Sequence, residues 1–557
     1  MKKPLLSELT LREKIGQTAL GRPGNKECWD PVKYPYGHIW ALGNLSQDFI
    51  NMADIASGTN LSLQTWLDWL ENYNKKVKVP ILPAMDCTSG IEKYFYETEP
   101  FLDPVTIGAA GGEELAYEAG TLRARLIKSV GSKWLWCPEV DITGRRLAIM
   151  HGRQYSDDIQ KLTSMGVADI KGTMSQRVAA CAKHFPGGNT LEYRDAHVAQ
   201  TIAYVTMEEW WRDQGAIFQK MIEAGVDSVM ISHGAFPAYD NTIVDGKFVP
   251  CSTSKRVITD LLKGEMGFKG VVITDGIGMR GLVNAYGGDY NRLYVELLNA
   301  GNDVLLGVFD GYFEAVEEAV RRGEISEARI DDACQRVLDM KERLGLFEDD
   351  AKVASGELEK VNEDIRNFKE RVAKKAVSLV CNKTQLLPVS KENIKNVAII
   401  YSGHDEEGDG KAYDNLHYMV EAFEKRGAKV HLQRRLSSYQ EIKKIAEEND
   451  LIVYAGYLMR YMPEGFSSFF GKEMQSFHFM LDSGADKSIG IGLGSPFMYF
   501  DFYASFKSFI NAYNYSEQTM EAVVAAIYGE IPFEGGHPFK LIPPDIEAKM
   551  KELGIES

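Results

Sequence analysis

Short apolar runs alternate with stretches of helical spacing from about residue 79 onward. Each run ends in polar or charged side chains, and the runs are Val79–Met85, Trp134–Val140, Val178–Ala182, Val226–Ile231, Gly270–Ile273 and Asp303–Leu306. Segments of helical spacing, such as 208–224 and 254–266, lie between them. Continuous apolar runs separated by helices are typical of parallel strands that are covered on both faces. Because so many units follow one another, the pattern favours an N-terminal (β/α)8-type TIM barrel over a doubly wound sheet.

A second alternating region follows a charged stretch without a strand pattern. Its predicted strands are Val397–Tyr401, Lys429–Leu432, Leu451–Tyr454 and Ser488–Leu493, with helices over 412–426 and 439–448. This arrangement predicts a smaller α/β sandwich. We therefore expect a catalytic domain at 1–345, a linker with a connecting helix at 346–375, and the sandwich domain with its C-terminal tail at 376–557. The glycines in Ile489–Ser495 do not have the GxGxxG spacing of a nucleotide loop, so a strand with close neighbours is expected there.

Composition narrows the class of protein. The 63 Lys and Arg against 79 Asp and Glu give a net charge of −16, which argues against nucleic acid or an anionic membrane as a partner. The chain has neither a membrane-spanning apolar run nor an apolar segment behind its first lysines, so we expect no cleaved signal peptide. The 7 cysteines are scattered, and none forms a CxxC pair. These features predict a cytoplasmic protein with reduced thiols.

Ionisable side chains stand at the ends of the predicted barrel strands. Barrel enzymes carry their chemistry at the carboxyl ends of the strands. Any single polar residue there can simply mark the point where a strand leaves the core, but six of them indicate a shared cleft. The six are Asp86, Asp141, Lys183, His184, His233 and Asp275.

The densest group of such residues runs from Lys183 to His197. In an extended loop, Asp195 and His197 face the same side, so the carboxylate can orient the imidazole and stabilise its protonated form. A histidine near its ordinary pKa can donate and accept protons at neutral pH. The alternative is a solvated loop with a chance Asp-x-His. Further along, Asp275 follows a very apolar strand and is a candidate nucleophile, base or substrate clamp, or else the N-cap of the next helix.

Taken together, these motifs resemble glycoside hydrolase family 3, and more narrowly its two-domain β-N-acetylglucosaminidase branch. The family's K-H-F-P-G segment reads Lys183–Gly187, and its D-S-H reads Asp195-Ala196-His197. Its T/S-D-x-L/I-x-M segment reads Thr274–Met279. Leu9–Gln17 resembles the opening helix of the family, Pro138–Ile142 its PVxDI, and Gly152–Tyr155 the Arg-containing segment that follows. The resemblance covers nearly the whole chain.

The resemblance implies roles for individual residues. Asp275 is the expected nucleophile of a retaining reaction, and His197, oriented by Asp195, is the expected acid and base. The residues expected to bind the sugar are Asp86, Arg153, Lys183, His184 and Met279. No metal ion or organic cofactor is implied, and the expected partner is a small oligosaccharide or glycoside. The protein is expected to be a monomer or homodimer.

Three departures from the family pattern bear on these roles. Ile91 stands where the family has an arginine, the loop before Asp195 is one residue longer than usual, and Gly276 and Gly278 replace bulkier residues after Asp275. The longer loop makes Glu192 a second candidate acid. We expect an exo-acting β-N-acetylhexosaminidase that hydrolyses terminal β-linked N-acetylglucosamine. A β-glucosidase or other β-hexosidase, a phosphate-using phosphorylase and a catalytically silent sugar-binding protein are the alternatives.

Overall fold

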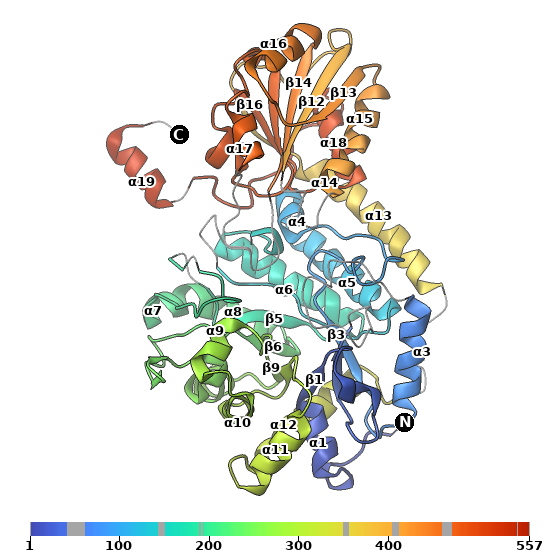
Figure 1. The fold of residues 1–557 in the computed structure, drawn as a ribbon, viewed down its shortest axis with the longest axis vertical. Helices are drawn as coiled ribbons and strands as arrows, with labels where there is room; N and C mark the ends of the chain where they lie inside the picture. The colour runs from blue at the N-terminus through green and yellow to red at the C-terminus, as the bar shows by residue number, and fades with distance from the viewer. Residues whose placement is uncertain are drawn as a thin grey trace. The chain divides into compact units, whose positions relative to one another are not determined.

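The computed structural model of the chain describes residues 2–41, 62–142, 151–188, 191–192, 194–348, 356–403, 411–458, 471–542 and 544–555. These residues form two compact units, which are coloured along the chain in Figure 1. The first unit comprises residues 1–101, 116–143 and 162–365, and the second comprises 102–115, 144–161 and 366–557. Two short segments from the N-terminal part of the chain therefore group with the second unit. Among the described residues, no helix combines the length and apolar character needed to cross a membrane.

Eight parallel strands form the centre of the first unit. One sheet has the order β10-β1-β2-β3-β4, and a second has the order β5-β6-β9. Parallel bridges Trp134–Ala179 and Ile273–Val304 join the two sheets at both edges, so the strands form a closed ring. The strands are β1 (Ala19–Gly21), β2 (His38–Trp40), β3 (Leu82–Met85), β4 (Trp134–Leu135), β5 (Cys181–Phe185), β6 (Ser228–Ile231), β9 (Val271–Thr274) and β10 (Leu305–Leu306). The predicted barrel is confirmed.

The barrel strands are short, and their side chains meet in one core. Leu20, Leu82, Trp134, Cys181 and Ile273 belong to a single buried apolar cluster. All six predicted runs contain or overlap a strand at the expected place, and Val178–Ala182 overlaps only the start of β5. The sequence pattern did not predict β1 and β2, which precede the first of the six predicted runs.

Helices follow most of the barrel strands, and Figure 1 shows several of them around the ring. Helix α1 begins with the capping box of the opening segment, in which the Thr10 side chain accepts from Glu13 N. A hairpin of β7 (Ile243–Val244) and β8 (Lys247–Phe248) follows β6. Up to residue 376 the helices are η1 (Leu6–Glu8), α1 (Leu11–Thr18), η2 (Lys26–Trp29), α3 (Leu63–Asn74), α4 (Pro104–Ala110), α5 (Glu113–Ser129), η3 (His151–Arg153), α6 (Ile159–Ser175), α7 (Met207–Trp210), η4 (Trp211–Gly215), α8 (Ala216–Glu223), η5 (Cys251–Thr253), η6 (Arg256–Glu265), α9 (Arg280–Val283), η7 (Asn284–Tyr286), α10 (Tyr290–Ala300), α11 (Tyr312–Arg321), α12 (Glu327–Arg343) and α13 (Glu357–Ala376).

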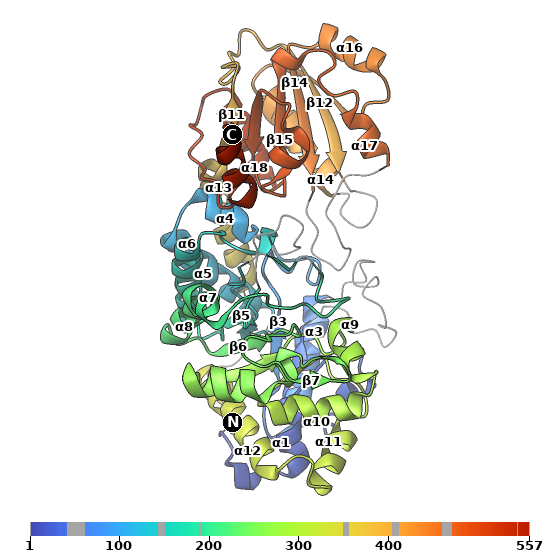
Figure 2. The same ribbon diagram turned by 90° about the vertical axis from the view of Figure 1, so that its left-hand side faces the viewer.

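The second unit is a six-stranded sheet with helices on both faces. Its order is β11-β16-β15-β14-β12-β13, and all neighbours are parallel except β11 and β16. In Figures 1 and 2, α16 and α17 lie on one side of the sheet and α18 on the other. The strands are β11 (Ser378–Asn382), β12 (Asn396–Gly403), β13 (Lys429–Arg434), β14 (Leu451–Tyr457), β15 (Ser488–Gly492) and β16 (Ser508–Asn511). The helices are α14 (Lys411–Asp414), α15 (Leu416–Glu424), α16 (Tyr439–Glu448), α17 (Lys472–Phe477), η8 (Ala485–Lys487), η9 (Tyr499–Tyr503), α18 (Glu517–Ile527) and α19 (Pro544–Leu553).

Two glycines of the Ile489–Ser495 segment lie inside strand β15, as the strand interpretation predicts. A Cβ on Gly490 would lie 2.4 Å from Cδ2 of Phe509, and one on Gly492 would lie 2.7 Å from Oδ1 of Asn511. The glycines therefore allow the close approach of strand β16.

Candidate active site

Lys183 is the centre of a buried charge network at the carboxyl end of the barrel. Its side chain is 2% exposed, and its Nζ donates to Oδ2 of Asp86 over 2.8 Å. Nζ also lies 3.2 Å from Oε1 of Glu139, which is completely buried. Thr88 Oγ1 donates to the other carboxylate oxygen of Asp86 over 2.8 Å. Two carboxylates thus compensate one ammonium, and Asp86 is held in place from both sides.

His184 follows Lys183 and points at a different carboxylate. Its Nδ1 lies 2.7 Å from Oδ2 of Asp141, and its backbone N–H donates to Oδ1 of Asp141 over 3.1 Å. Its Nε2 lies 3.9 Å from Oδ2 of Asp275. Burial alone would lower the pKa of His184, but the carboxylates of Asp141, Asp275 and Glu139 outweigh it and raise that pKa. The electrostatic environment therefore favours a protonated imidazole directed at Asp275.

Asp275 comes directly after strand β9 and is 23% exposed. Its Oδ1 accepts the Gly276 N–H over 2.7 Å, which leaves Oδ2 on the side of His184. Burial alone would raise the pKa of Asp275, but His184, His233 and His197 hold that pKa below its usual value. The residue is therefore an ionised, partly accessible carboxylate at neutral pH, as a nucleophile requires.

The Asp195–His197 pair forms as the sequence predicts. Oδ1 of Asp195 lies 2.7 Å from Nδ1 of His197 and accepts the His197 backbone N–H over 2.8 Å. Burial alone would raise the pKa of Asp195, but these hydrogen bonds outweigh it and lower that pKa. The imidazole is 32% exposed, and its backbone carbonyl accepts from Arg280 N on the segment after Asp275. The loop is thereby fastened beside the segment that carries Asp275, and Nε2 of His197 is left for proton transfer.

Glu192 was a second candidate acid, but its contacts indicate a structural role. Its carboxylate accepts from the Arg194 backbone N–H, from Arg194 Nε and Nη2, and from Ile202 N. Burial alone would raise the pKa of Glu192, but these donors lower it. A carboxylate with a lowered pKa is a poor proton donor at neutral pH. The Glu192 carboxylate instead links Arg194 to Ile202, on either side of the Asp195–His197 pair. Residues 189, 190 and 193 of this loop lie outside the described residues.

Of the other ionisable residues here, Asp141 and His233 were expected in the shared cleft without an assigned role, and Glu139 was not singled out by the sequence. Glu139 and Asp141 alternate along the segment beside β5, where Val140 N donates to Lys183 O. The alternation puts both carboxylates on the side of Lys183 and His184, and this spacing by two was the available signal. His233, which follows β6, has Nδ1 2.8 Å from Ser252 Oγ and Nε2 3.0 Å from the Gly276 carbonyl.

Two of the predicted sugar-binding residues lie outside the network. Met279 is half-buried at the start of α9, and its N–H donates to the Gly276 carbonyl, which keeps it near Asp275. Arg153 is half-buried at the end of η3, within a segment of the second unit. The first unit therefore carries Asp86, Lys183, His184, Asp195, His197, Asp275 and Met279, whereas Arg153 belongs to the second unit.

Ile91 is completely buried, so its side chain belongs to the core beneath the segment after β3. A cation nevertheless occurs two residues later. Lys93 Nζ lies 5.0 Å from the centre of the Tyr94 ring. Tyr94 raises the pKa of Lys93, and Asp86 contributes in the same direction against burial. A positive charge is therefore still present near Asp86.

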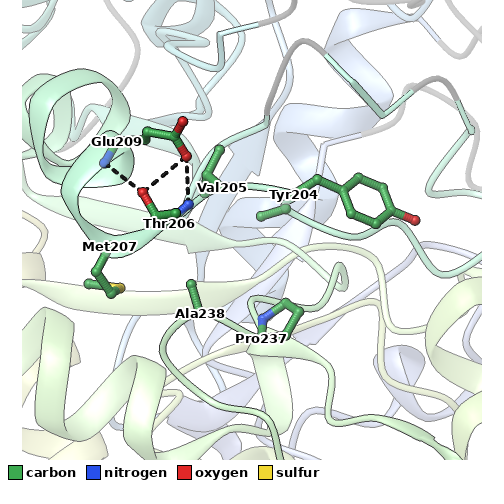
Figure 3. Close-up of a pocket in the computed structure, with 8 residues that line it drawn as sticks. Tyr204, Val205, Thr206, Met207, Glu209, Pro237 and Ala238 are labelled. Atoms are coloured by element: carbon green, nitrogen blue, oxygen red, sulfur yellow. Dashed lines mark hydrogen bonds between the residues drawn. The ribbon is translucent and has the colours of Figure 1, made fainter.

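The first unit also has an open hollow of about 640 Å³ at its surface, lined by Ala203, Tyr204, Val205, Thr206, Met207, Glu209, Pro237 and Ala238. Figure 3 shows its apolar wall and the hydrogen bonds between Thr206 and Glu209, which cap helix α7. Its lining includes none of the predicted site residues. Among the described residues, no group of three His, Cys, Asp or Glu side chains is placed to hold a metal ion.

Comparison with known proteins agrees with this geometry. Residues 10–340 match the model of the glycosyl hydrolase family 3 N-terminal domain, which is more than half of the chain. The chain therefore belongs to glycosyl hydrolase family 3, a family of enzymes that cleave O-glycosyl bonds. The resemblance deduced from the sequence motifs is confirmed.

The similar proteins are named as enzymes that act on β-glycosides. A β-N-acetylglucosaminidase/β-glucosidase of Cellulomonas fimi is 25% identical over 476 residues, which are 83% of each chain. A β-hexosaminidase of Stenotrophomonas maltophilia is 33% identical over 234 residues, or 41% of this chain and 67% of the relative. Among solved structures, β-glucoside phosphorylase BglX has a TM-score of 0.81 at 22% identity and covers 97% of this chain and 95% of its own. A family 3 β-N-acetylglucosaminidase of Paenibacillus sp. has a TM-score of 0.76 at 23% identity, with coverage of 96% and 99%. These structures share the fold with this chain.

Proposed function

We propose that this protein is a retaining exo-glycosidase that hydrolyses terminal β-linked N-acetylglucosamine. The observation that carries the proposal is the pairing of an ionised Asp275 with the adjacent Asp195–His197 dyad. The dyad also discriminates against the silent sugar-binding alternative, since binding alone does not require a histidine oriented for proton transfer. The names of the relatives support the choice of an acetamido sugar.

The reaction proceeds in two steps in this proposal. The Asp275 carboxylate attacks the anomeric carbon while protonated His197 gives its proton to the departing glycosidic oxygen. Neutral His197 then takes a proton from water, which attacks the same carbon and releases the Asp275 carboxylate. Asp195 fixes the Nδ1 side of the imidazole through both steps and stabilises the imidazolium. Two displacements at one carbon retain its configuration.

The charge network would hold the sugar. Asp86 is an acceptor for sugar hydroxyls, whereas Lys183 and His184 are donors whose positions are fixed by Asp86, Glu139 and Asp141. Fixed donors and acceptors discriminate between sugar stereoisomers because a wrong isomer leaves buried polar groups unpaired. Met279 remains a proposed contributor to this subsite, and Arg153 remains a proposed sugar-binding residue of the second unit.

The test compares 4-nitrophenyl β-N-acetylglucosaminide with the β-glucoside, each with and without phosphate. We expect a higher kcat/KM for the acetamido sugar, without a need for phosphate. A preference for the glucoside would replace this proposal by a β-glucosidase. Formation of sugar 1-phosphate would replace it by a phosphorylase, an alternative that a histidine acid favours because it repels an anionic acceptor less than a carboxylate does.

Two variants test the assigned roles. Asp275→Ala should reduce kcat by about 10⁴-fold or more while sugar binding stays measurable. His197→Ala should slow alkyl glycosides far more than nitrophenyl glycosides, since a good leaving group needs less protonation. Asp289→Asn changes an exposed helix cap on α10 and serves as the matched control. Undiminished turnover by Asp275→Ala would refute the nucleophile assignment.

A further inference from the structure

Arg22 lies at the same end of the barrel as Asp275, outside the charge network around Lys183. It directly follows β1, which pairs with β2 on one side and β10 on the other. Its guanidinium lies over the ring of Trp40, the last residue of β2, with Cζ 5.5 Å from the ring centre. On the other side a Cβ on Gly307 would lie 2.8 Å from Nη2, and the φ of +80° at that position also favours glycine. The ends of three neighbouring strands thus form a fitted recess for this side chain.

No described residue forms a hydrogen bond or an ion pair with the Arg22 side chain, and its Nε is a buried donor without a partner. Three other cations of the barrel unit have carboxylate partners. Arg123 pairs with Asp169 over 2.6 Å, Lys263 pairs with Asp303 over 2.9 Å, and Lys183 meets two carboxylates. Burial lowers the pKa of Arg22 and thus disfavours its charge. A partly buried guanidinium with neither an anion nor a hydrogen-bond partner among the described residues is costly, so we expect its anion to arrive with a ligand.

The backbone holds Arg22 in place before any ligand arrives. Arg22 N donates to Oδ1 of Asn25 over 2.8 Å, and Asn25 Nδ2 donates to the Val308 carbonyl over 3.0 Å. These bonds tie the segment after β1 to the segment after β10. With its backbone fixed and its guanidinium over the Trp40 ring, the side chain loses less conformational freedom on binding than a solvated arginine, which favours a specific contact.

An aromatic wall connects this recess to the Asp275 segment. The rings of Tyr290 and Phe309 meet edge-on with centres 4.7 Å apart, and Phe309 is 37% exposed. Tyr290 is close enough to Arg22 for an electrostatic interaction. A Cβ on Gly278, three residues after Asp275, would lie 3.6 Å from Cζ of Phe309. Gly278 therefore lies beside the Phe309 ring, and Phe309 and Tyr290 lie between the segment after Asp275 and Arg22.

We propose that Arg22 binds an oxyanion, a phosphate or carboxylate group, at the mouth of the active site. This rests on the proposed function in taking the carboxyl end of the barrel as the site of reaction. The planar fork of a guanidinium matches the paired oxygens of either group. The anion has two sources: free phosphate that accepts the sugar, or an acidic group on the glycoside. With free phosphate, a phosphate oxygen bonds to the anomeric carbon as the ester bond to Asp275 breaks, and the Asp275 carboxylate leaves with the bonding pair.

The test uses the full-length protein and the variant Arg22→Met, with Arg212→Met as a matched control. Arg212 is an exposed arginine paired with Asp213, so the control removes the same charge from the surface. Inorganic phosphate is titrated calorimetrically at constant ionic strength. We expect millimolar binding by the natural protein, a Kd raised at least tenfold in Arg22→Met, and no change in the control. Sugar 1-phosphate among the products identifies free phosphate as the ligand.

The second arm compares phenyl and 4-carboxyphenyl glycosides of the same sugar. If the anion belongs to the substrate, kcat/KM of the natural protein is at least tenfold higher for the 4-carboxyphenyl glycoside than for the phenyl glycoside. In Arg22→Met the ratio of these two kcat/KM values falls to about one. The proposal is overturned if Arg22→Met changes neither phosphate affinity nor this preference, or if its Tm falls well below that of the natural protein, which would make Arg22 structural. If no glycoside is turned over, the proposed function fails, whereas the phosphate titration and the Tm still decide the role of Arg22.

Discussion

Two buried lysines lie at opposite ends of the same barrel and have opposite surroundings. At the carboxyl end, Lys183 meets the carboxylates of Asp86 and Glu139. At the amino end, Lys341 on α12 donates to Oε1 of Gln17 and to the carbonyls of Gly37 and Pro80, which precede β1, β2 and β3. Burial lowers the pKa of Lys341 to about 7, and its described hydrogen bonds all go to neutral oxygens.

The difference shows how one residue type serves two purposes in one fold. Carboxylates keep a buried ammonium charged and leave Asp86 partly exposed, so Lys183 can act on a ligand. Neutral oxygens give Lys341 three hydrogen bonds and close the amino end of the barrel, but they offset the cost of burying its charge only partly. In barrel enzymes, the carboxyl end is the functional face and the amino end contributes stability.

The largest expected effect comes from breaking the carboxyl end. Lys183→Met should reduce kcat/KM by about 10²–10³-fold, because it leaves the carboxylates of Asp86 and Glu139 without their cation and removes a donor. Steady-state kinetics on the nitrophenyl glycoside measures the loss. Lys341→Met is the matched variant at the amino end and should change kcat/KM less than threefold. Equal losses in the two variants would contradict the division between the two ends.

The second effect concerns the histidine beside Lys183. Asp141→Asn removes the charge that raises the pKa of His184, and we expect a loss of about 10–100-fold in kcat/KM. Because burial alone lowers the pKa of His184, the variant imidazole loses its proton at a lower pH. The alkaline limb of the kcat/KM profile should therefore move to lower pH. An unchanged limb would show that the protonation of His184 does not limit the reaction.

A smaller effect is expected from the bonds that close the Asp195–His197 loop. Glu192→Gln weakens the contacts to Arg194 and Ile202, so alkyl glycosides should slow by roughly tenfold and nitrophenyl glycosides by less. Glu209→Gln, which changes the cap of α7, is the matched control. In a His197→Ala background the Glu192 change should add little. Full additivity of the two losses would mean that Glu192 acts independently of the dyad.

The smallest effect on activity but a clear effect on stability is expected at Lys341. Its pKa is about 7 in the folded state against roughly 10.4 in an unfolded chain, so the unfolded state binds more protons between these values. The free energy of unfolding should therefore gain a contribution as pH rises from about 7 to 10. Lys341→Met should lack that gain, which urea unfolding at several pH values measures. If the free energy of unfolding had the same pH dependence in both proteins, Lys341 would not be the source of the gain.

Much of this architecture was predictable because its signals are local. The apolar runs that end at Asp86, Asp275 and the Lys183–His184 pair identified barrel strands and placed their ends at one edge. The spacing of Asp195 and His197 was enough to predict their hydrogen bond, because residues two apart in an extended loop share a side. Strands β1 and β2 were missed, since the residues that stabilise them lie in β3 and β10, far away in the chain.

The sequence by itself determined the two α/β regions, the family and the residues that carry the proposed chemistry, because periodicity and motif spacing are properties of neighbouring residues. Only the tertiary structure decided which charges meet. Among the described residues, it gave Lys183 two carboxylates and Lys341 none, and it left Arg22 in a recess without a partner. It also assigned Glu192 to an ion pair with Arg194 and buried Ile91. Ionisation states and binding roles depend on burial and on charges from distant segments, and those are fixed only when the barrel closes.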